Sequence, residues 1–193
     1  MNELKLFTLA LGLHKPWKVV NTEFSKETGR LDLTIDFNRG ATFACPACGS
    51  GNCPVHDTRE RQWRHLNFFQ YETYIHARVP RINCGQCGVK QVEVPWSRPG
   101  SGFTLLFEML ILQLSREMSI AAVAEITQVY SNRIWRILGH YVEEARKEID
   151  LSEFHVLGID EFSVRKGHDY VTTFSDIGES RVLYVAESRR KEV

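Results

Sequence analysis

Cys45-Pro-Ala-Cys48-Gly49 and Cys84-Gly-Gln-Cys87-Gly88 are two cysteine pairs, separated by residues 49–83, that decide how the first part of this chain folds. A Cys-x-x-Cys turn lets both thiolates reach one ion, and the glycine after it permits the positive φ that turns backbone N–H groups toward sulfur. Four thiolates suit a closed, tetrahedral zinc site, which is structural rather than catalytic. We predict structural Zn²⁺ at Cys45, Cys48, Cys84 and Cys87, with a disulfide or unbound buried thiols as the alternatives.

Cys53 and His56 also have the spacing of metal ligands, so either residue could replace a member of the two pairs. Such residues are more often loop or core groups beside a site, and their roles stay open. Cysteine pairs in a chain without a signal peptide favour metal over disulfides, which predicts a cytoplasmic protein. No apolar run approaches the roughly 20 residues that span a bilayer, so no membrane partner is expected.

Residues 1–98 read as a mixed module with an opening helix over Leu6–Leu13 and several strands. Trp17–Phe24 and Arg30–Phe37 flank the turn Lys26–Gly29, which predicts a hairpin. The second strand alternates cleanly, with Leu31, Leu33, Ile35 and Phe37 on one face, and a further strand is expected over Tyr71–Val79.

Residues 99–150 read as a helical domain that follows a linker rich in proline and glycine. Phe103–Leu114 is apolar nearly all round, as in a buried helix. Ser119 and Ser131 offer N-caps for two further helices, and the turn Thr127–Tyr130 lies between them. Three such helices fit a helix-turn-helix, although a plain helical hairpin is equally compatible because the turn lacks a glycine. One face of the last helix carries Ile134, Leu138, Tyr141 and Ala145.

Two sets of side chains are candidates for DNA contact. Arginine suits guanine, asparagine suits adenine, and both residue types can bond phosphate. The net charge is zero, with 24 basic and 24 acidic residues, but residues 59–98 hold seven basic residues against three acids. A solvated basic face is the alternative for both sets. The predicted DNA-binding residues are Arg59, Arg61 and Arg64 in the first module and Asn132, Arg133, Arg136 and His140 in the last helix.

Residues 151–193 predict a three-strand antiparallel meander over Val156–Val164, Tyr170–Asp176 and Arg181–Ala186, with turns at Lys166–Asp169 and Ile177–Ser180. Asp160 stands inside the first strand, where an ionised carboxylate is costly to bury unless it is paired or binds metal. Pairing with Arg165 or Lys166 is the alternative to a metal role.

The motifs in their order along the chain resemble the insertion-sequence transposases of the ISL-three type. The residues that carry the resemblance are, over about 40–190, C-P-x-C-G, W-R-H-L, R-V-P-R-I-x-C-x-x-C-G-V-K, V-P-W-S-R-P-G-S-G-F-T and L-G-I-D-E-F-S-V-R-K-G-H-D-Y-V-T. The resemblance implies a zinc module and a helix-turn-helix that recognise terminal inverted repeats. It also implies a ribonuclease-H-like catalytic domain with an Asp-Asp-Glu triad, in which Asp160 is the first carboxylate.

The expected fold is therefore α+β and multi-domain. It comprises a zinc-ribbon-like β module at residues 1–98, a helix-turn-helix at 99–150 and the first three strands of an incomplete ribonuclease-H-like α/β domain at 151–193. The family chemistry is phosphoryl transfer with two Mg²⁺ ions held by carboxylates. The second Asp and the Glu are expected beyond Val193, so we expect this truncated chain to lack catalytic activity, and Mg²⁺ only in a complete domain.

Three functions compete at this point. The chain is a truncated transposase that binds DNA, a regulator that occupies transposon ends and represses the full-length enzyme, or a zinc-stabilised protein-interaction module without a DNA role. Competition with the full-length enzyme for the same ends separates the first two. Absent or salt-insensitive DNA binding would favour the third.

Overall fold

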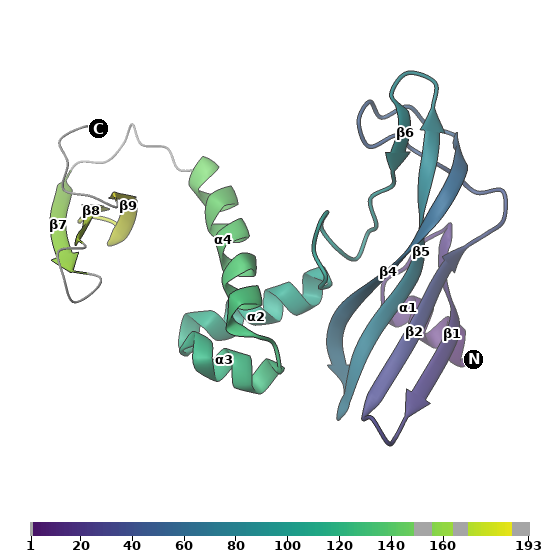
Figure 1. Ribbon diagram of the computed structural model, residues 1–193, viewed down its shortest axis with the longest axis horizontal. Helices are drawn as coiled ribbons and strands as arrows, with labels where there is room; N and C mark the ends of the chain where they lie inside the picture. Colours follow the sequence, from purple (N-terminus) through teal and green to yellow (C-terminus); the bar gives the residue numbers. More distant parts are fainter. Residues whose placement is uncertain (1, 149–155, 164–169, 187–193) are drawn as a thin grey trace. The chain divides into compact units, whose positions relative to one another are not determined.

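The computed structural model of the protein describes residues 2–148, 156–163 and 170–186 (Figure 1). Its contacts divide the chain into two compact units, Met1–Gly139 and His140–Val193. No helix in the described part of the chain is both long and apolar enough to cross a membrane.

A six-stranded sheet dominates the first unit. The strands follow the order β1-β2-β5-β4-β3, and β6 pairs with the far end of β5. The long strand β5 has β2 beside its first half and β6 beside its second half, and Pro80, which has no N–H to donate, lies between the two pairings. The elements are α1 (Glu3–Ala10), β1 (Trp17–Ser25), β2 (Arg30–Phe37), β3 (Thr42–Phe43), β4 (Cys53–Phe68), β5 (Tyr71–Cys84) and β6 (Gly88–Gln91).

The hairpin predicted from the sequence is confirmed as the antiparallel pair β1–β2. The strand expected at Tyr71–Val79 exists but continues to Cys84. The short strands β3 and β6 and the full extent of β4 were not predicted. The parallel pairing of β2 with β5, from Arg30 opposite Glu72 to Ile35 opposite Ala77, joins segments too far apart for local patterns to reveal.

One face of this sheet forms the core. The alternation predicted for β2 is confirmed, since Leu31, Leu33 and Ile35 are at most 1% exposed. Ile75 and Ile82 of β5 are completely buried in the same cluster. Helix α1 adds Phe7, and its Thr8 hydroxyl accepts a hydrogen bond from the Val19 N–H of β1 at 3.0 Å.

Three helices follow the sheet: α2 (Leu105–Glu117), α3 (Ile120–Thr127) and α4 (Ser131–Lys147). Ser119 caps α3 as predicted, by accepting a hydrogen bond from the Ala122 N–H. Ser131 is the first helical residue of α4 rather than its N-cap, because the Tyr130 carbonyl already accepts from the N–H groups of Arg133 and Ile134.

The turn between α3 and α4 needs no glycine. Gln128 itself adopts the left-handed conformation, with φ of 55°, and its side chain donates to the Glu125 carbonyl. The buried face of α4 consists of Ile134 and Ile137, with Leu138 half-buried. The prediction that Ala145 shares this face is wrong, because Ala145 is exposed.

The second unit contains the predicted antiparallel meander of β7 (Leu157–Ser163), β8 (Tyr170–Asp176) and β9 (Arg181–Ala186). The predicted turn at Lys166–Asp169 lies outside the described residues. The fold is therefore mixed α and β, and the ribonuclease-H-like assignment stays a prediction.

Candidate metal centre and nucleic-acid interface

The structure brings the four predicted zinc ligands together. The sulfur atoms of Cys45, Cys48, Cys84 and Cys87 all lie within 4.8 Å of one another. Cys45 and Cys48 belong to the loop between β3 and β4, whereas Cys84 ends β5 and Cys87 precedes β6. Because β4 and β5 are paired, the two turns meet at the same end of the sheet.

The turns have the backbone geometry that the sequence predicted. Gly49 and Gly88 have φ angles of 72° and 71°, a region that L side chains avoid. In the second turn, the backbone N–H groups of Gln86 and Cys87 donate to the Cys84 sulfur and lower its pKa. Four cysteine sulfurs at this separation are the donor set that zinc prefers, so the residues fit a closed Cys₄ site.

Cys53 and His56 lie outside the four-sulfur cluster. The Cys53 thiol is buried and donates to the Ser50 carbonyl at 3.4 Å, and burial raises its pKa. His56 is exposed on β4. Because its sulfur is not part of the four-sulfur cluster and its thiol bonds a backbone carbonyl, Cys53 reads as a core residue beside the cluster.

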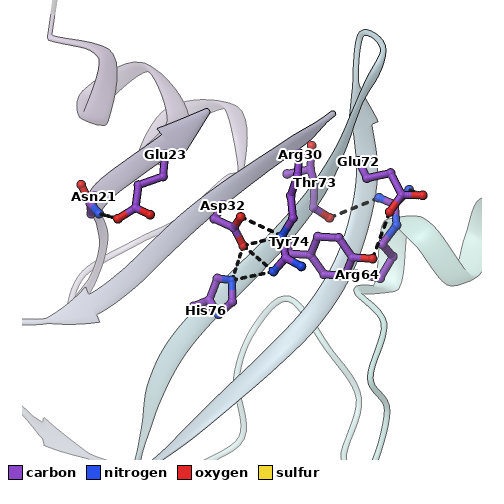
Figure 2. Close-up of polar contacts among 9 residues, drawn as sticks. All are labelled: Asn21, Glu23, Arg30, Asp32, Arg64, Glu72, Thr73, Tyr74 and His76. Atoms are coloured by element: carbon purple, nitrogen blue, oxygen red, sulfur yellow. Dashed lines mark hydrogen bonds and ion pairs between the residues drawn. The ribbon is translucent and has the colours of Figure 1, made fainter. Parts of the chain in front are cut away.

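Arg64, predicted to bind DNA, is instead part of the core. Its side chain is 7% exposed, and its guanidinium donates to the Thr73 carbonyl at 3.2 Å and lies 3.6 Å from the Glu72 carboxylate. Figure 2 shows this arginine beside Tyr74, whose ring centroid is 5.3 Å away. The Phe107 ring of α2 lies 5.1 Å from the same guanidinium, so Arg64 holds the sheet to the helices.

The segment predicted as a linker is irregular but packed. The Arg64 N–H donates to the Gly102 carbonyl, and the Thr104 N–H donates to the Arg64 carbonyl. Thr104 also caps α2 and is 2.8 Å from Nδ1 of His65. Burial, reinforced by the charge of Arg64, lowers the pKa of His65 to about 4 and keeps this imidazole neutral.

Trp96 and Glu108 complete the contact between the sheet and the helices. We call this contact, which also includes Arg64, His65 and Thr104, the packed joint. Trp96 packs between Trp17 and Trp63, with ring centroids 5.1 and 5.6 Å away. The fully buried Glu108 accepts hydrogen bonds from Arg98 at 2.9 Å and from Ser101 at 2.6 Å. Sequence reasoning missed Glu108, although an acid inside an otherwise apolar helix was a visible signal.

Much of the local positive charge of residues 59–98 is neutralised by ion pairs with acidic residues of the same chain. Arg78 pairs with Asp36, Arg81 with Asp57, and Arg98 with Glu108. Arg59, Arg61 and Lys90 are exposed, and within the described residues no ion pair involves them. Arg59 and Arg61 therefore remain accessible to a ligand, in contrast to Arg64.

The candidates on α4 also differ in their surroundings. Asn132 and Arg136 are exposed, and His140 is half-buried. The Arg133 guanidinium lies over the Phe103 ring, 4.3 Å from its centroid, which is a cation–π contact. Trp135, which sequence reasoning did not select, is 60% exposed beside Arg136.

Asp160 is exposed on β7 and accepts a hydrogen bond from the Glu161 N–H. The expectation that the apolar strand buries this carboxylate is wrong for the described residues, because Ile159 and Phe162 are exposed too. Its alternative partners Arg165 and Lys166 lie outside the described residues. Asp176, by contrast, is buried and accepts from Gly178, Glu179 and Arg181, so it fixes the β8–β9 turn.

Three family models match the chain one after another. The zinc-finger of transposase IS204/IS1001/IS1096/IS1165 matches residues 41–92 and the helix-turn-helix domain of transposase family ISL3 matches residues 92–142. A transposase model of the DDE type in the same family matches residues 157–193. The first model contains all four clustered cysteines, and the second contains Trp96, Thr104, Glu108 and α2 to α4 through residue 142.

Curated relatives agree with the family models. The transposase for insertion sequence element IS1557 of Mycobacterium tuberculosis is 27% identical over 99% of this chain. The transposase for IS1001 of Bordetella parapertussis is 28% identical over 95% of it. The chain spans 44% and 45% of the lengths of these relatives, and no solved structure matches it. Because the zinc-finger, helix-turn-helix and transposase models match one after another between residues 41 and 193, the chain belongs to the ISL3 family of insertion-sequence transposases.

Proposed function

We propose that residues 1–150 of this chain recognise the terminal inverted repeats of an insertion sequence, with a zinc module at 1–98 that supports a helix-turn-helix at 99–150. One observation carries this proposal: the helix-turn-helix is packed against the sheet that ends in the Cys₄ cluster, through Arg64 and Thr104. A rigid, braced helix is what reading the major groove requires.

The zinc ion is structural in this proposal. Cys45, Cys48, Cys84 and Cys87 hold it, and the ion supplies no chemistry beyond fixing the two turns to each other. Metal analysis of the purified chain should give about one zinc per chain, and a chelator should unfold the end of the sheet.

DNA binding is tested by titrating the zinc-loaded chain against duplexes of the element's ends and against scrambled duplexes, at two salt concentrations. We expect selective binding that weakens with salt, because Arg59, Arg61 and Arg136 would contact phosphates or bases and release counterions. Loss of binding after chelation would link the metal to the helices. Equal affinity for ends and scrambled duplexes would contradict the proposal.

Residues 151–193 begin a ribonuclease-H-like catalytic domain in this proposal, with Asp160 as the first carboxylate for Mg²⁺. Two-metal phosphoryl transfer requires several carboxylates around the ions. The 193-residue polypeptide, tested alone with Mg²⁺, should therefore bind the ends without cutting or joining them. Specific cleavage by this polypeptide would overturn that expectation.

A further inference from the structure

The solvent-facing side of α4 is well defined within the first unit. Asn132, Trp135, Arg136 and Gly139 are all exposed and recur at i, i+3, i+4 and i+7, which places them on one face of a helix. Ile134 and Ile137 are buried on the opposite face. Trp135 and Gly139 therefore share the exposed face with Asn132 and Arg136, and Gly139 lies one turn further along the helix than Trp135 and Arg136.

The first turns of α4 carry positive side chains at the positive end of the helix dipole. No acidic residue occurs in residues 131–142, and the first turn contains Arg133 where an acid would stabilise the helix. The first acids of α4 are Glu143 and Glu144, beyond the exposed face. A positive helix N-terminus lined by arginine complements a polyanion.

Gly139 has no packing reason to be a glycine. A Cβ atom at this position would meet nothing within 4 Å, and its φ is not in the left-handed region. Glycine inside a helix destabilises it relative to alanine because the unfolded backbone is freer. A glycine here leaves the helix backbone accessible to a ligand.

Trp135 has no packing role that explains its size either, because it is 60% exposed on the same face as Asn132 and Arg136. An indole ring beside arginine and asparagine is suited to a surface that offers both hydrogen-bond acceptors and an apolar group. The major groove of DNA offers both, because guanine and adenine present acceptors and thymine presents its C5-methyl group.

We propose that α4 enters the major groove by its Asn132–Trp135–Arg136–Gly139 face, and that Trp135 determines specificity by contacting a thymine methyl group. Gly139 lets the groove wall approach the helix. Arg133 is a positioning residue, because its stacking on Phe103 holds the start of α4 against the packed joint. This inference rests on the proposed DNA binding by the helix-turn-helix.

The test starts from duplexes that the full, zinc-loaded chain selects from a random-sequence pool. Each thymine of the selected duplex is then replaced by uracil, which removes only the methyl group. Wild type should bind one or more uracil-substituted duplexes about tenfold more weakly than the parent duplex. Trp135→Ala should bind the parent duplex about tenfold more weakly than wild type does, and it should bind the uracil-substituted and parent duplexes equally well. Met109→Ala, which removes an apolar side chain of similar exposure from α2, should bind as wild type does.

Gly139→Ala gives a second and independent readout. Alanine should raise the melting temperature, because it favours the helix, and should weaken binding to the selected duplex. If Trp135→Ala and Gly139→Ala both keep wild-type affinity and wild-type discrimination of uracil, this inference is wrong while the DNA-binding function stands. If wild type selects no sequence from the pool, the proposed function itself fails, and this inference fails with it.

Discussion

The two sheets of this protein use similar strand residues and bury them very differently. In the sheet of β1–β6, Leu31, Ile35 and Ile75 are completely buried. In the β7–β9 meander, Ile159 is 61% exposed and Val182 is 56% exposed in the described part of the chain. Both sheets contain hydrogen-bonded antiparallel pairs, such as β4–β5 and β7–β8, and the first sheet also contains the parallel β2–β5 pair.

The difference shows that strand pattern alone does not make a core. The first sheet has a covering layer of α1, the aromatic cluster around Trp96 and the turns of the Cys₄ cluster. The described residues of the second sheet have no such layer, so its apolar side chains contribute little to the stability of those strands. A sheet must bury one face against another element to gain hydrophobic stabilisation.

Loss of one thiolate should have the largest effect, and only on the first sheet. Cys84→Ser should abolish zinc binding and unfold the end of the β1–β6 sheet, because metal binding and folding are coupled in small zinc modules. Zinc analysis and tryptophan fluorescence measure this, since all four tryptophans belong to the first unit. Cys53→Ser is the matched control, because Cys53 lies outside the cluster and should retain one zinc per chain.

Core truncation compares the two sheets directly. Ile75→Ala should lower the free energy of unfolding by about 2–5 kcal/mol, because it leaves a cavity in a completely buried cluster. Ile159→Ala, at an exposed position, should change stability by less than about 0.5 kcal/mol. Denaturant unfolding measures the first change and hydrogen exchange of β7–β9 the second. Comparable losses at both positions would mean that Ile159 is covered in solution.

Acid should weaken the first unit through His65. Its pKa is about 4 in the folded chain and 6.5 when exposed, so the unfolded state takes up the proton first as pH falls. The contribution of neutral His65 to the free energy of unfolding is fully present above pH 6.5. It is lost as pH falls toward 4, and the loss is roughly 2–3 kcal/mol. His65→Gln should remove this part of the pH dependence. The difference between wild type and variant isolates His65, because acid-driven metal loss affects both proteins.

The smallest expected effect concerns two residues in the left-handed region, one in each unit. Gln128 has φ of 55° and Ser180 has φ of 51°. Glycine removes the strain but frees the unfolded chain, so Gln128→Gly should stabilise the first unit by about 0.5–1 kcal/mol. Ser180→Gly should give a comparable gain only if β8 and β9 unfold cooperatively. A thermal melt of each variant, followed by circular dichroism, makes the comparison.

Local chemistry was readable in the sequence because it depends on neighbouring residues. The β1–β2 hairpin, the capping of α3 by Ser119 and the glycine geometry of Gly49 and Gly88 all follow from spacing and turn chemistry. The grouping of the four cysteines was predictable for the same reason, since each pair is a local turn. Their meeting at one end of the sheet required only that the intervening strands pair.

Only the tertiary structure decided the roles of side chains whose contacts are far away in the sequence. Arg64 and Arg59 are two basic residues of one strand, yet Arg64 is buried against Thr73 and Phe107 while Arg59 is exposed. Residues 59–62 are all exposed, whereas Trp63 and Arg64 are both buried, so the contrast depends on the neighbours Trp96 and Phe107 that cover this end of the strand. The sequence by itself determined the clustering of the four cysteines, the hairpin and the helices. The parallel β2–β5 pairing, the packed joint and the accessible arginines were decided by contacts that no local pattern contains.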